Sequence, residues 1–311
     1  MINNMQELLA AAQASPPVAI AVAGAQEPET LKAVARAKDL NIAVPILVGD
    51  SSWIISTLEK MGARSQDFEI INEKDPTRAA ATAADITGKG KAVILVKGGV
   101  TTATFLHAAL GHPGDLKAGL LSDVEVYEDD RRQGCKFVLV SDGGINISPG
   151  IKQKLEIIRN AVSVARCLGI RKPRVALLSG SEKVHPDFQS TIDAVAIVKM
   201  CQDGAIEGCV VDGPFALDNA IDADAARLKG IESPVAGYAD ILIVHNVEAG
   251  NIFCKGLQYY GHRMLIHVAV GAKVPILIDS RTAKAEEKLH SVALAKIMHL
   301  SGQQQAPQEG N

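Results

Sequence analysis

Aromatic residues are scarce in this chain of 311 residues, where Phe, Trp and Tyr together make up 4% of the sequence. So few aromatic side chains offer little surface on which nucleobases could stack. The formal net charge of −3 also lacks the dense basic surface that a general nucleic-acid binder needs for counterion release. We therefore expect no nucleic-acid partner. Compact anionic ligands remain possible, because a few local basic groups are enough to bind them.

Long apolar runs and paired cysteines are also absent. No apolar stretch approaches the roughly 20 residues that a membrane-spanning helix requires, and the first residues lack the basic start of a signal peptide. The five cysteines include no CxxC pair, which is typical of reduced thiols rather than of disulfides or a zinc ribbon. The sequence predicts a cytoplasmic protein with no membrane association.

Common nucleotide and metal motifs are missing as well. The chain contains no GxxxxGK[ST] phosphate loop, no GxGxxG after a strand and no HExxH. Neither ATP hydrolysis nor a Rossmann-bound nicotinamide is indicated. We expect no metal and no organic cofactor.

Short β-branched runs alternate with longer helical patterns along almost the whole chain. Most of these runs are continuously apolar, which is the pattern of strands buried on both faces of a sheet. The alternation predicts an α/β fold with mainly parallel sheets, and the length predicts one large domain or two medium ones. The expected strands are 18–22, 45–49, 68–71, 92–96, 136–140, 174–178, 208–212, 241–245, 265–270 and 274–278. The expected helices include 28–40, 75–87, 149–168 and 189–202.

Two segments fall outside this alternation. The charged stretch 127–136 contains a glycine, and we interpret it as a crossover or a domain boundary. The tail 301–311 is rich in Gln and other polar residues, and it is expected to be disordered.

The loops that follow the strands are the candidate binding sites, because ligands of parallel α/β folds lie at the carboxyl ends of the strands. The loop KGGVTTAT (97–104) offers Lys97, Gly98, Thr101 and Thr102 as an anion cradle, with backbone N–H groups close to the ligand at the glycines. A glycine turn followed by a threonine-capped helix explains the same residues without a ligand. The sequence leaves both interpretations open.

Polar side chains also follow three strands in the second half of the chain. Helix capping and turn formation account for much of this pattern, but polar loops of this kind also line clefts. The candidate binding residues in these loops are Asp142, Asn146, Asp212, Asn246, Glu248, Gly250 and Asn251.

The last apolar strand, 274–278, leads into Ser280 and Arg281, and a helix with Glu286 and Glu287 in its first turns follows. Acidic residues suit the positive end of a helix dipole. An arginine at the end of the strand does not, because a cation there faces the N-terminus of that helix. The residues alone leave open whether this segment only ends a strand and starts a helix or forms a site.

Distinctive blocks of sequence occur over essentially the whole chain. They are VAIAVAGAQEPETLKAVARAKDLNIAVPILVGD (18–50), SDGGINISP (141–149), VALLSGSEKVHP (175–186), STIDAVAI (190–197), VDGPFALDNAI (211–221), KGIESPVAGYADILIVHNVEAGNI (229–252) and VGAKVPILIDSRTAKAEEKLHSVALA (270–295). In collinear order, these blocks resemble the phosphate acetyl/butyryl transferase family, and its phosphate butyryltransferase branch in particular.

The resemblance implies two α/β/α domains like those of isocitrate/isopropylmalate dehydrogenases, with an active site in the cleft between them, in a homodimer. One domain would comprise 1–127 plus 273–311, and the other would be the inserted segment 128–272. The implied reaction is acyl-CoA + phosphate = acyl phosphate + CoA, with butyryl or another short or branched acyl group and no metal or prosthetic group.

By the same resemblance, Ser280 and Arg281 belong to the catalytic site, and Glu287, with Glu286 beside it, takes the proton from the CoA thiol. The residue types suit this chemistry. A thiol with a pKa of roughly 8.5 needs a nearby base to attack as a thiolate. A guanidinium can pair bidentately with the leaving phosphate, and a serine hydroxyl can orient the thiol.

The chain departs from the butyryl branch of the family between residues 107 and 123. That branch usually carries arginines and a Ser-His pair there. This chain has Lys117 as the one cation of residues 114–127 and Ser122-Asp123 at the pair, and His107 replaces a frequent arginine.

Three alternative functions remain open on the sequence. The first is an acetyl-preferring phosphate acetyltransferase, and the second is a non-catalytic relative that binds CoA or acyl phosphate. The third is a metal- and nicotinamide-dependent dehydrogenase of the same architecture, for which Asp212 and Asp218 would have to supply the metal site.

Overall fold

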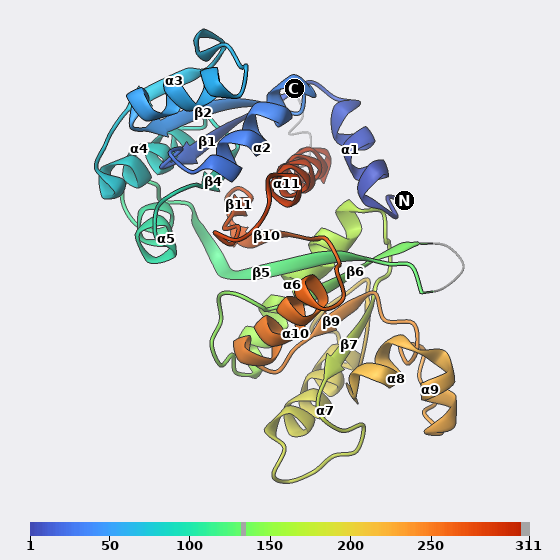
Figure 1. The fold of residues 1–311 in the computed structure, drawn as a ribbon. Helices are drawn as coiled ribbons and strands as arrows, with labels where there is room; N and C mark the ends of the chain where they lie inside the picture. Colours follow the sequence, from blue (N-terminus) through green and yellow to red (C-terminus); the bar gives the residue numbers. More distant parts are fainter. Residues whose placement is uncertain (132–134, 306–311) are drawn as a thin grey trace, which may run out of the picture. The chain divides into compact units, whose positions relative to one another are not determined.

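A computed structural model of the chain describes residues 1–131 and 135–305 (Figure 1). The chain divides into two compact units. The flanking unit comprises Met5–Gly119 and Ile266–Asn311, and the inserted unit comprises Met1–Asn4 and Leu120–Leu265. The α/β class with mainly parallel strands is confirmed in both units.

The boundaries between the units differ from the expected 127/128 and 272/273. Strand β5 (Lys117–Asp129) pairs antiparallel with β6 (Lys136–Ser141), from Glu125 opposite Val140 to Asp129 opposite Lys136. This pairing places residues 127–129 and 136 inside the inserted unit, and the boundary between the units lies at 119/120 instead. Residues 132–134 of that stretch lie outside the described part of the chain.

The flanking unit has the strand order β3-β2-β1-β4-β11-β10. All neighbours run parallel except β10 and β11, which are antiparallel. The inner strands are apolar and buried on both faces, as their continuous apolar runs predict. The bounds are β1 (Val18–Ala23), β2 (Ala43–Gly49), β3 (Glu69–Asn72), β4 (Ile94–Lys97), β10 (Leu265–Ala272) and β11 (Ile276–Leu277).

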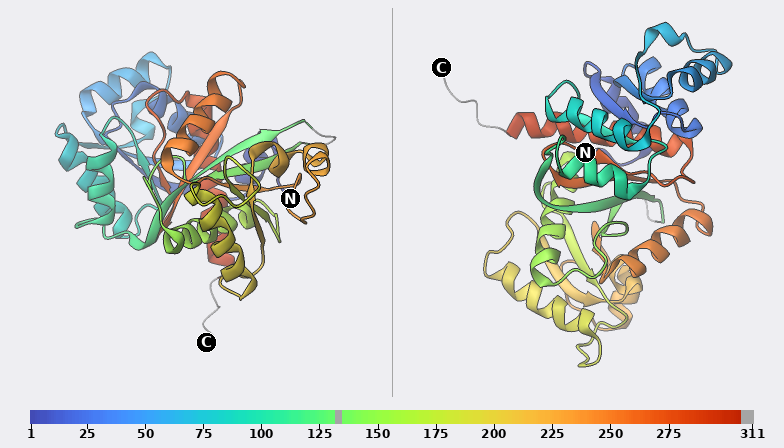
Figure 2. Two further views of the ribbon diagram at one scale, coloured as in Figure 1. Left: turned by 90° about the horizontal axis from the view of Figure 1, so that it is seen from below. Right: turned by 90° about the vertical axis from the view of Figure 1, so that its left-hand side faces the viewer.

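Helices cover both faces of this sheet (Figure 2). α2 packs against α11, α1 also contacts α11, and α4 packs against α5. The tail is not disordered from 301 as expected, because α11 continues to Gln305; residues 306–311 lie outside the described range. The bounds are α1 (Met5–Gln13), α2 (Pro28–Asp39), α3 (Ser51–Lys60), the 3₁₀ turn η1 (Ser65–Asp67), α4 (Pro76–Gly88), α5 (Thr102–Leu110) and α11 (Ala285–Gln305).

The inserted unit has the strand order β5-β6-β9-β7-β8, in which β5 is the antiparallel member. Helices α6 and α7 cover one face of the sheet, and α8 and α10 cover the other (Figure 2). Its apolar core includes Tyr127, Val138, Phe215 and Leu242. The remaining bounds are β7 (Arg174–Leu178), β8 (Val210–Phe215), β9 (Ile241–Ile243), α6 (Ile151–Cys167), α7 (Gln189–Gln202), α8 (Leu217–Ile221), α9 (Ala223–Leu228) and α10 (Val247–Tyr259).

Candidate active site

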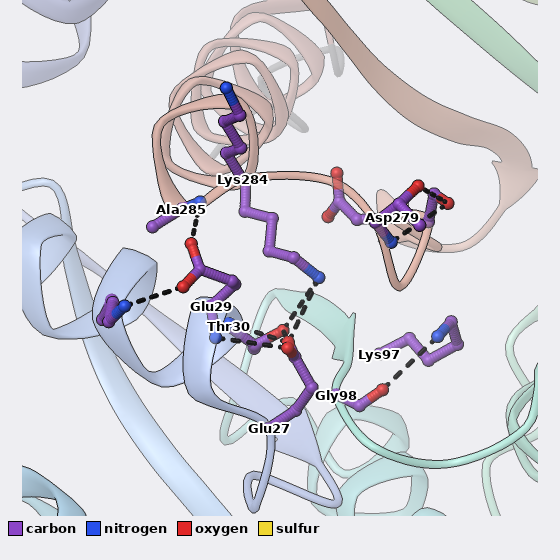
Figure 3. Close-up of polar contacts among 12 residues, drawn as sticks. Glu27, Glu29, Thr30, Lys97, Gly98, Asp279, Lys284 and Ala285 are labelled. Carbon is purple, nitrogen blue, oxygen red and sulfur yellow. Dashed lines mark hydrogen bonds and ion pairs between the residues drawn. The ribbon is translucent and has the colours of Figure 1, made fainter. Parts of the chain in front are cut away.

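Three loops of the flanking unit meet at one edge of its sheet. Strands β1, β4 and β11 are parallel neighbours, so the segments that follow their carboxyl ends lie together. Figure 3 shows the side chains of Lys97 and Asp279 on neighbouring loops, with Glu27 and Thr30 at the start of α2 beyond them. This edge therefore unites Lys97 with the Ser280–Arg281 segment that the sequence singled out.

A tight turn presents the predicted catalytic Ser280 and Arg281. The N–H of Ala283 donates to the carbonyl of Ser280 at 3.0 Å, and the hydroxyls of Ser280 and Thr282 are hydrogen-bonded at 3.0 Å. Arg281 lies at the exposed tip of this turn. Among the described residues, no hydrogen bond or ion pair engages its guanidinium, which leaves that group available to an anion.

The two predicted acids, Glu286 and Glu287, occupy different environments at the start of α11. Glu286 is partly exposed and forms an ion pair with Arg36 of α2. Glu287 is buried, and its Oε2 accepts the N–H of Lys284 at 2.7 Å. This contact is the reach-back half of a capping box. Glu286 therefore links two helices at the surface, whereas Glu287 lies inside the first turn.

A second acid completes the cap of α11. Glu29 of α2 accepts the N–H of Ala285 at 2.9 Å (Figure 3). Its pKa is lowered by the hydrogen bond from Lys32 and by the bond from Ala285. Glu29 and Glu287 together satisfy backbone donors that a helix start leaves without partners.

Lys97 is buried at the end of β4, and its Nζ donates only to the carbonyl of Gly98, at 3.3 Å, among the described residues. Burial lowers the pKa of its ammonium group, and the charges of Lys288 and Arg281 lower it further. Asp279 and Glu27 oppose this effect. A buried cation with a single long hydrogen bond is well suited to take up an anionic group.

The glycines beside Lys97 do not form the expected backbone cradle. The N–H of Gly98 donates to the carbonyl of Ala23 at 2.9 Å, and that of Gly99 donates to the carbonyl of Gly24 at 2.6 Å. A Cβ at Gly98 would lie 2.2 Å from the Gly24 oxygen, so this position needs glycine to let the loops after β1 and β4 approach closely. The glycines serve loop packing, and their N–H groups are occupied.

The threonines of the same loop begin helix α5. The Oγ1 of Thr101 accepts the N–H of Thr104 at 3.2 Å, so Thr101 is the N-cap that the alternative interpretation predicts. Thr102 is exposed in the first turn. A binding role for either residue stays a prediction.

Several polar residues at this edge were not identified from the sequence. Lys288 is buried on α11, with its Nζ 3.3 Å from Glu27 Oε2 and 3.1 Å from Thr30 Oγ1. Glu27 caps α2, and its pKa is lowered, against the effect of burial, by the hydrogen bond from Thr30 and the charge of Lys288. The N-cap position before Pro28 was a usable signal for Glu27. Lys288 gave none, because its burial depends on the packing of α11.

Asp279, which directly precedes the turn of Ser280 and Arg281, was also not identified from the sequence. Its side chain is buried, and Oδ1 lies 3.1 Å from His267 Nε2 on β10 and accepts the Ser291 hydroxyl of α11 at 3.1 Å. Burial raises its pKa, but the charge and hydrogen bond of His267 outweigh this effect, so the pKa is lowered. A carboxylate at the end of the strand, next to Ser280, was the available signal.

In the inserted unit, Asp142 and Asn146 bind to their own loop. The Asp142 carboxylate accepts the N–H groups of Gly144 and Ile145, each at 2.9 Å, and the side-chain amide of Asn146 at 2.6 Å. The Asn146 amide also donates to the carbonyl of Leu121 at 2.9 Å. Burial and the nearby Asp123 charge raise the pKa of Asp142. These contacts shape the loop, which agrees with the capping interpretation.

Gly250 and Asp212 also have structural partners. A Cβ at Gly250 would lie 2.8 Å from the Asp142 carbonyl oxygen, so the glycine permits close packing of α10 on that loop. Asp212 accepts the N–H of Gly213 at 2.8 Å and the hydroxyl of Ser233. Asp218 pairs instead with Lys229 at 3.0 Å. Asp212 and Asp218 therefore hold separate contacts.

The remaining candidates lie at the start of α10. Asn246 is its N-cap and accepts the N–H of Ala249 at 2.9 Å. Glu248 and Asn251 line an open hollow of about 690 Å³ together with Gly144, Val247 and Ile252. A ligand could contact Glu248 and Asn251 there, and their binding roles stay predictions.

Neither a metal centre nor a membrane segment is found in residues 1–131 and 135–305. No three His, Cys, Asp or Glu side chains of this range gather as a metal site would require. None of its helices combines the length and apolar character needed to cross a bilayer.

Fold, site and comparison with known proteins agree on the class: two-unit α/β enzymes of acyl transfer. The chain belongs to the phosphate acetyl/butaryl transferase family, whose model matches residues 57–296. It is 40% identical to the phosphate butyryltransferase of Clostridium beijerinckii over 96% of this chain and 98% of that protein. It is 35% identical to the phosphate acetyltransferase of Thermotoga maritima over 89% and 94%, respectively.

A solved structure supports the same class. The branched-chain phosphotransacylase of Enterococcus faecalis has a TM-score of 0.79 to this chain at 30% identity. The match covers 91% of this chain and 99% of that structure. The resemblance noted in the sequence is thereby confirmed.

Proposed function

We propose that this protein is a phosphotransacylase that interconverts acyl-CoA and phosphate with acyl phosphate and CoA, with a butyryl or other short or branched acyl group. The observation that carries the proposal is the exposed Arg281 guanidinium, which has no internal partner among the described residues and shares the sheet edge with buried Lys97. Two cations at one edge suit a reaction in which both acyl phosphate and free phosphate are anionic.

The residues suggest the following course from acyl phosphate to acyl-CoA. Glu287 removes the proton from the CoA thiol, and the thiolate sulfur attacks the acyl carbonyl carbon. A C–S bond forms, the bond from that carbon to the phosphate oxygen breaks, and phosphate leaves with the electron pair. Arg281 and Lys97 stabilise the charge that develops on the carbonyl and phosphate oxygens. The Ser280 hydroxyl orients the sulfur.

The environments of the two acids favour Glu287 as the base. Glu286 is committed to Arg36, and protonating it would weaken that ion pair. Glu287 is buried next to the turn that carries Ser280 and Arg281, where a low dielectric strengthens the electrostatic interactions of its carboxylate.

The preferred acyl group is supported by the relatives rather than by a pocket. The 40% identity to a phosphate butyryltransferase favours butyryl, and the 35% identity to a phosphate acetyltransferase keeps acetyl as the alternative. A methylene group in an apolar pocket changes the transition-state free energy by only about 1–3 kcal/mol, so related enzymes can differ in this preference.

The proposal includes no metal or organic cofactor, because a thiol, a base and cations are sufficient for this acyl transfer. We also propose a homodimer in the cytoplasm, as the family resemblance implies. The sedimentation coefficient in solution would test the oligomeric state.

The proposed activity can be tested by thiol release from butyryl-CoA and acetyl-CoA, with and without phosphate. We expect phosphate-dependent release that Arg281→Ala reduces by about 10²–10³-fold, since a preorganised cation at developing charge contributes that much. Arg78→Ala is the matched control, because Arg78 is an exposed arginine of the same unit that pairs with Glu73.

The outcomes separate the alternatives. Faster release from butyryl-CoA than from acetyl-CoA supports the butyryl assignment, and the reverse supports the acetyl one. A folded wild-type protein that binds CoA but releases no thiol from either ester would be a non-catalytic relative, and the proposal would be wrong.

A further inference from the structure

The buried carboxylate of Asp279 joins three elements of the flanking unit immediately before the catalytic turn. It belongs to the segment after β11, lies 3.1 Å from His267 Nε2 of β10 and accepts the hydroxyl of Ser291 of α11 at 3.1 Å. The Ser291 oxygen in turn accepts the N–H of His267 at 3.2 Å. A residue adjacent to Ser280 is thus fixed from both sides.

The same carboxylate faces the cations of the site. Lys97 of β4 and Lys288 of α11 both interact electrostatically with Asp279. Two further positive groups, Lys288 and Arg281, lie close enough to Lys97 to lower the pKa of its ammonium group. Such a cluster is repulsive in a buried environment unless negative charge lies near it.

Among the described residues, Asp279 and Glu27 are two carboxylates that counter the cations around Lys97. Glu27 already accepts hydrogen bonds from Thr30 and pairs with Lys288 at 3.3 Å. Among the described residues, the Asp279 carboxylate caps no helix start, and it lies beside the turn that carries Arg281. It is therefore the acid whose charge can act on Lys97 and whose position can act on the turn.

We propose that Asp279 is a positioning residue for the transacylase reaction: it anchors the Ser280–Arg281 turn to β10 and α11, and its negative charge supports phosphate binding at Lys97. This inference rests on the proposed function. It adds that phosphate affinity and turn geometry are both controlled by one residue that does not touch the substrate.

The charge effect has a definite direction. Burial, Lys288 and Arg281 lower the pKa of Lys97, and Asp279 opposes them. Replacing Asp279 with Asn removes the opposing charge while keeping the size of the side chain. The Lys97 ammonium should then lose its proton at lower pH, so phosphate affinity should fall at lower pH than in the wild type.

The test measures binding of inorganic phosphate by calorimetry and turnover of butyryl-CoA from about pH 6 to about pH 10, in wild type, Asp279→Asn and Ser291→Ala. For Asp279→Asn we expect phosphate affinity to be lost at a pH about one unit lower than in the wild type. At a given alkaline pH in that range, the variant should bind phosphate about tenfold more weakly. Ser291→Ala keeps the Asp279 charge but loses the hydrogen bond from residue 291 to it. For this variant we expect kcat to fall about threefold to tenfold, while the pH at which phosphate affinity is lost stays the same.

Glu29→Gln is the control for general damage to the start of α11. Glu29 accepts the N–H of Ala285 there, but its charge pairs with Lys32. Glu29→Gln should leave unchanged the alkaline pH at which phosphate affinity is lost.

If Asp279→Asn loses phosphate affinity at the same pH as the wild type, the charge effect is wrong. If kcat is unchanged in Ser291→Ala, the anchoring effect is wrong. A wild type that binds phosphate without turnover would instead contradict the proposed function. If Asp279→Asn does not fold, Ser291→Ala still decides the anchoring effect. Asp279→Ser then tests the charge effect, because it also removes the carboxylate charge and keeps a small polar side chain.

Discussion

At the scale of single residues, neighbouring side chains of one type differ sharply in what they can do. Glu286 and Glu287 are consecutive acids at the start of α11, and the sequence could not separate them. The structure does so because a helix turns by about 100° per residue, which directs one toward Arg36 at the surface and the other inward.

The comparison of these two acids gives a prediction. Glu287→Gln should reduce kcat for thiol release by about 10²-fold or more, because the thiol loses its base. Glu286→Gln should change kcat by less than about threefold, since an exposed ion pair contributes little. Steady-state rates of both variants, with circular dichroism to confirm folding, would measure the difference. Equal losses would show that the helix start as a whole matters, and not one base.

The sequence supplied candidate site residues only where the signal is local, and their roles stay predictions. Ser280, Arg281 and the acidic pair followed from their positions after a strand and from the family resemblance. Lys288 and His267 did not, because their partners come from elements far away in the sequence. Asp142 and Asn146 were expected to bind substrate, and their side chains form hydrogen bonds within their own loop and with the Leu121 carbonyl of β5.

At the scale of elements, continuous apolar runs identified the strands correctly. Every expected strand is found, with shifts of a few residues at the ends. The strand that was missed, β5, alternates charged and apolar residues and pairs antiparallel at the side of its sheet, so it lacks the continuous apolar run of a buried parallel strand.

Two glycines of α10 allow a matched test of element packing. Gly250→Ala should destabilise the protein by about 1–3 kcal/mol, because the new Cβ would lie 2.8 Å from the Asp142 carbonyl and 2.9 Å from Gly143 Cα. Gly256→Ala meets nothing within 4 Å and should stabilise the helix by about 0.5–1 kcal/mol. Urea unfolding of both variants would reveal the opposite signs, and destabilisation by both would contradict the packing argument.

At the scale of the whole molecule, buried ion pairs couple the fold to pH. In the inserted unit, Asp240 accepts hydrogen bonds from the Arg174 side chain at 3.1 Å and from Lys136 at 2.9 Å. Burial raises the pKa of Asp240, but these two partners outweigh it, so the pKa is lowered on folding. A carboxyl group of this kind stabilises the fold above its unfolded pKa of about 3.9, and the stabilisation is lost as pH falls toward the folded value.

Asp240→Asn should therefore lower the unfolding free energy by about 1–3 kcal/mol at neutral pH, because two partly exposed cations lose the buried carboxylate that accepts their hydrogen bonds. The difference from wild type should shrink as the pH falls below about 4. Thermal unfolding from about pH 7 to about pH 3 would measure it. A difference that stays constant over this range would assign the loss to packing rather than to charge.

The flanking unit is assembled from segments at both ends of the described chain, and this has a consequence for synthesis on the ribosome. Strand β11 fills the position between β4 and β10, and it carries the Ser280–Arg281 turn with it. Residues 120–265 can emerge and collapse as a contiguous unit while β4 still has an open edge. The predicted catalytic turn is therefore completed last, when the nascent chain delivers residues 276–305 and β11 fills its place in the sheet.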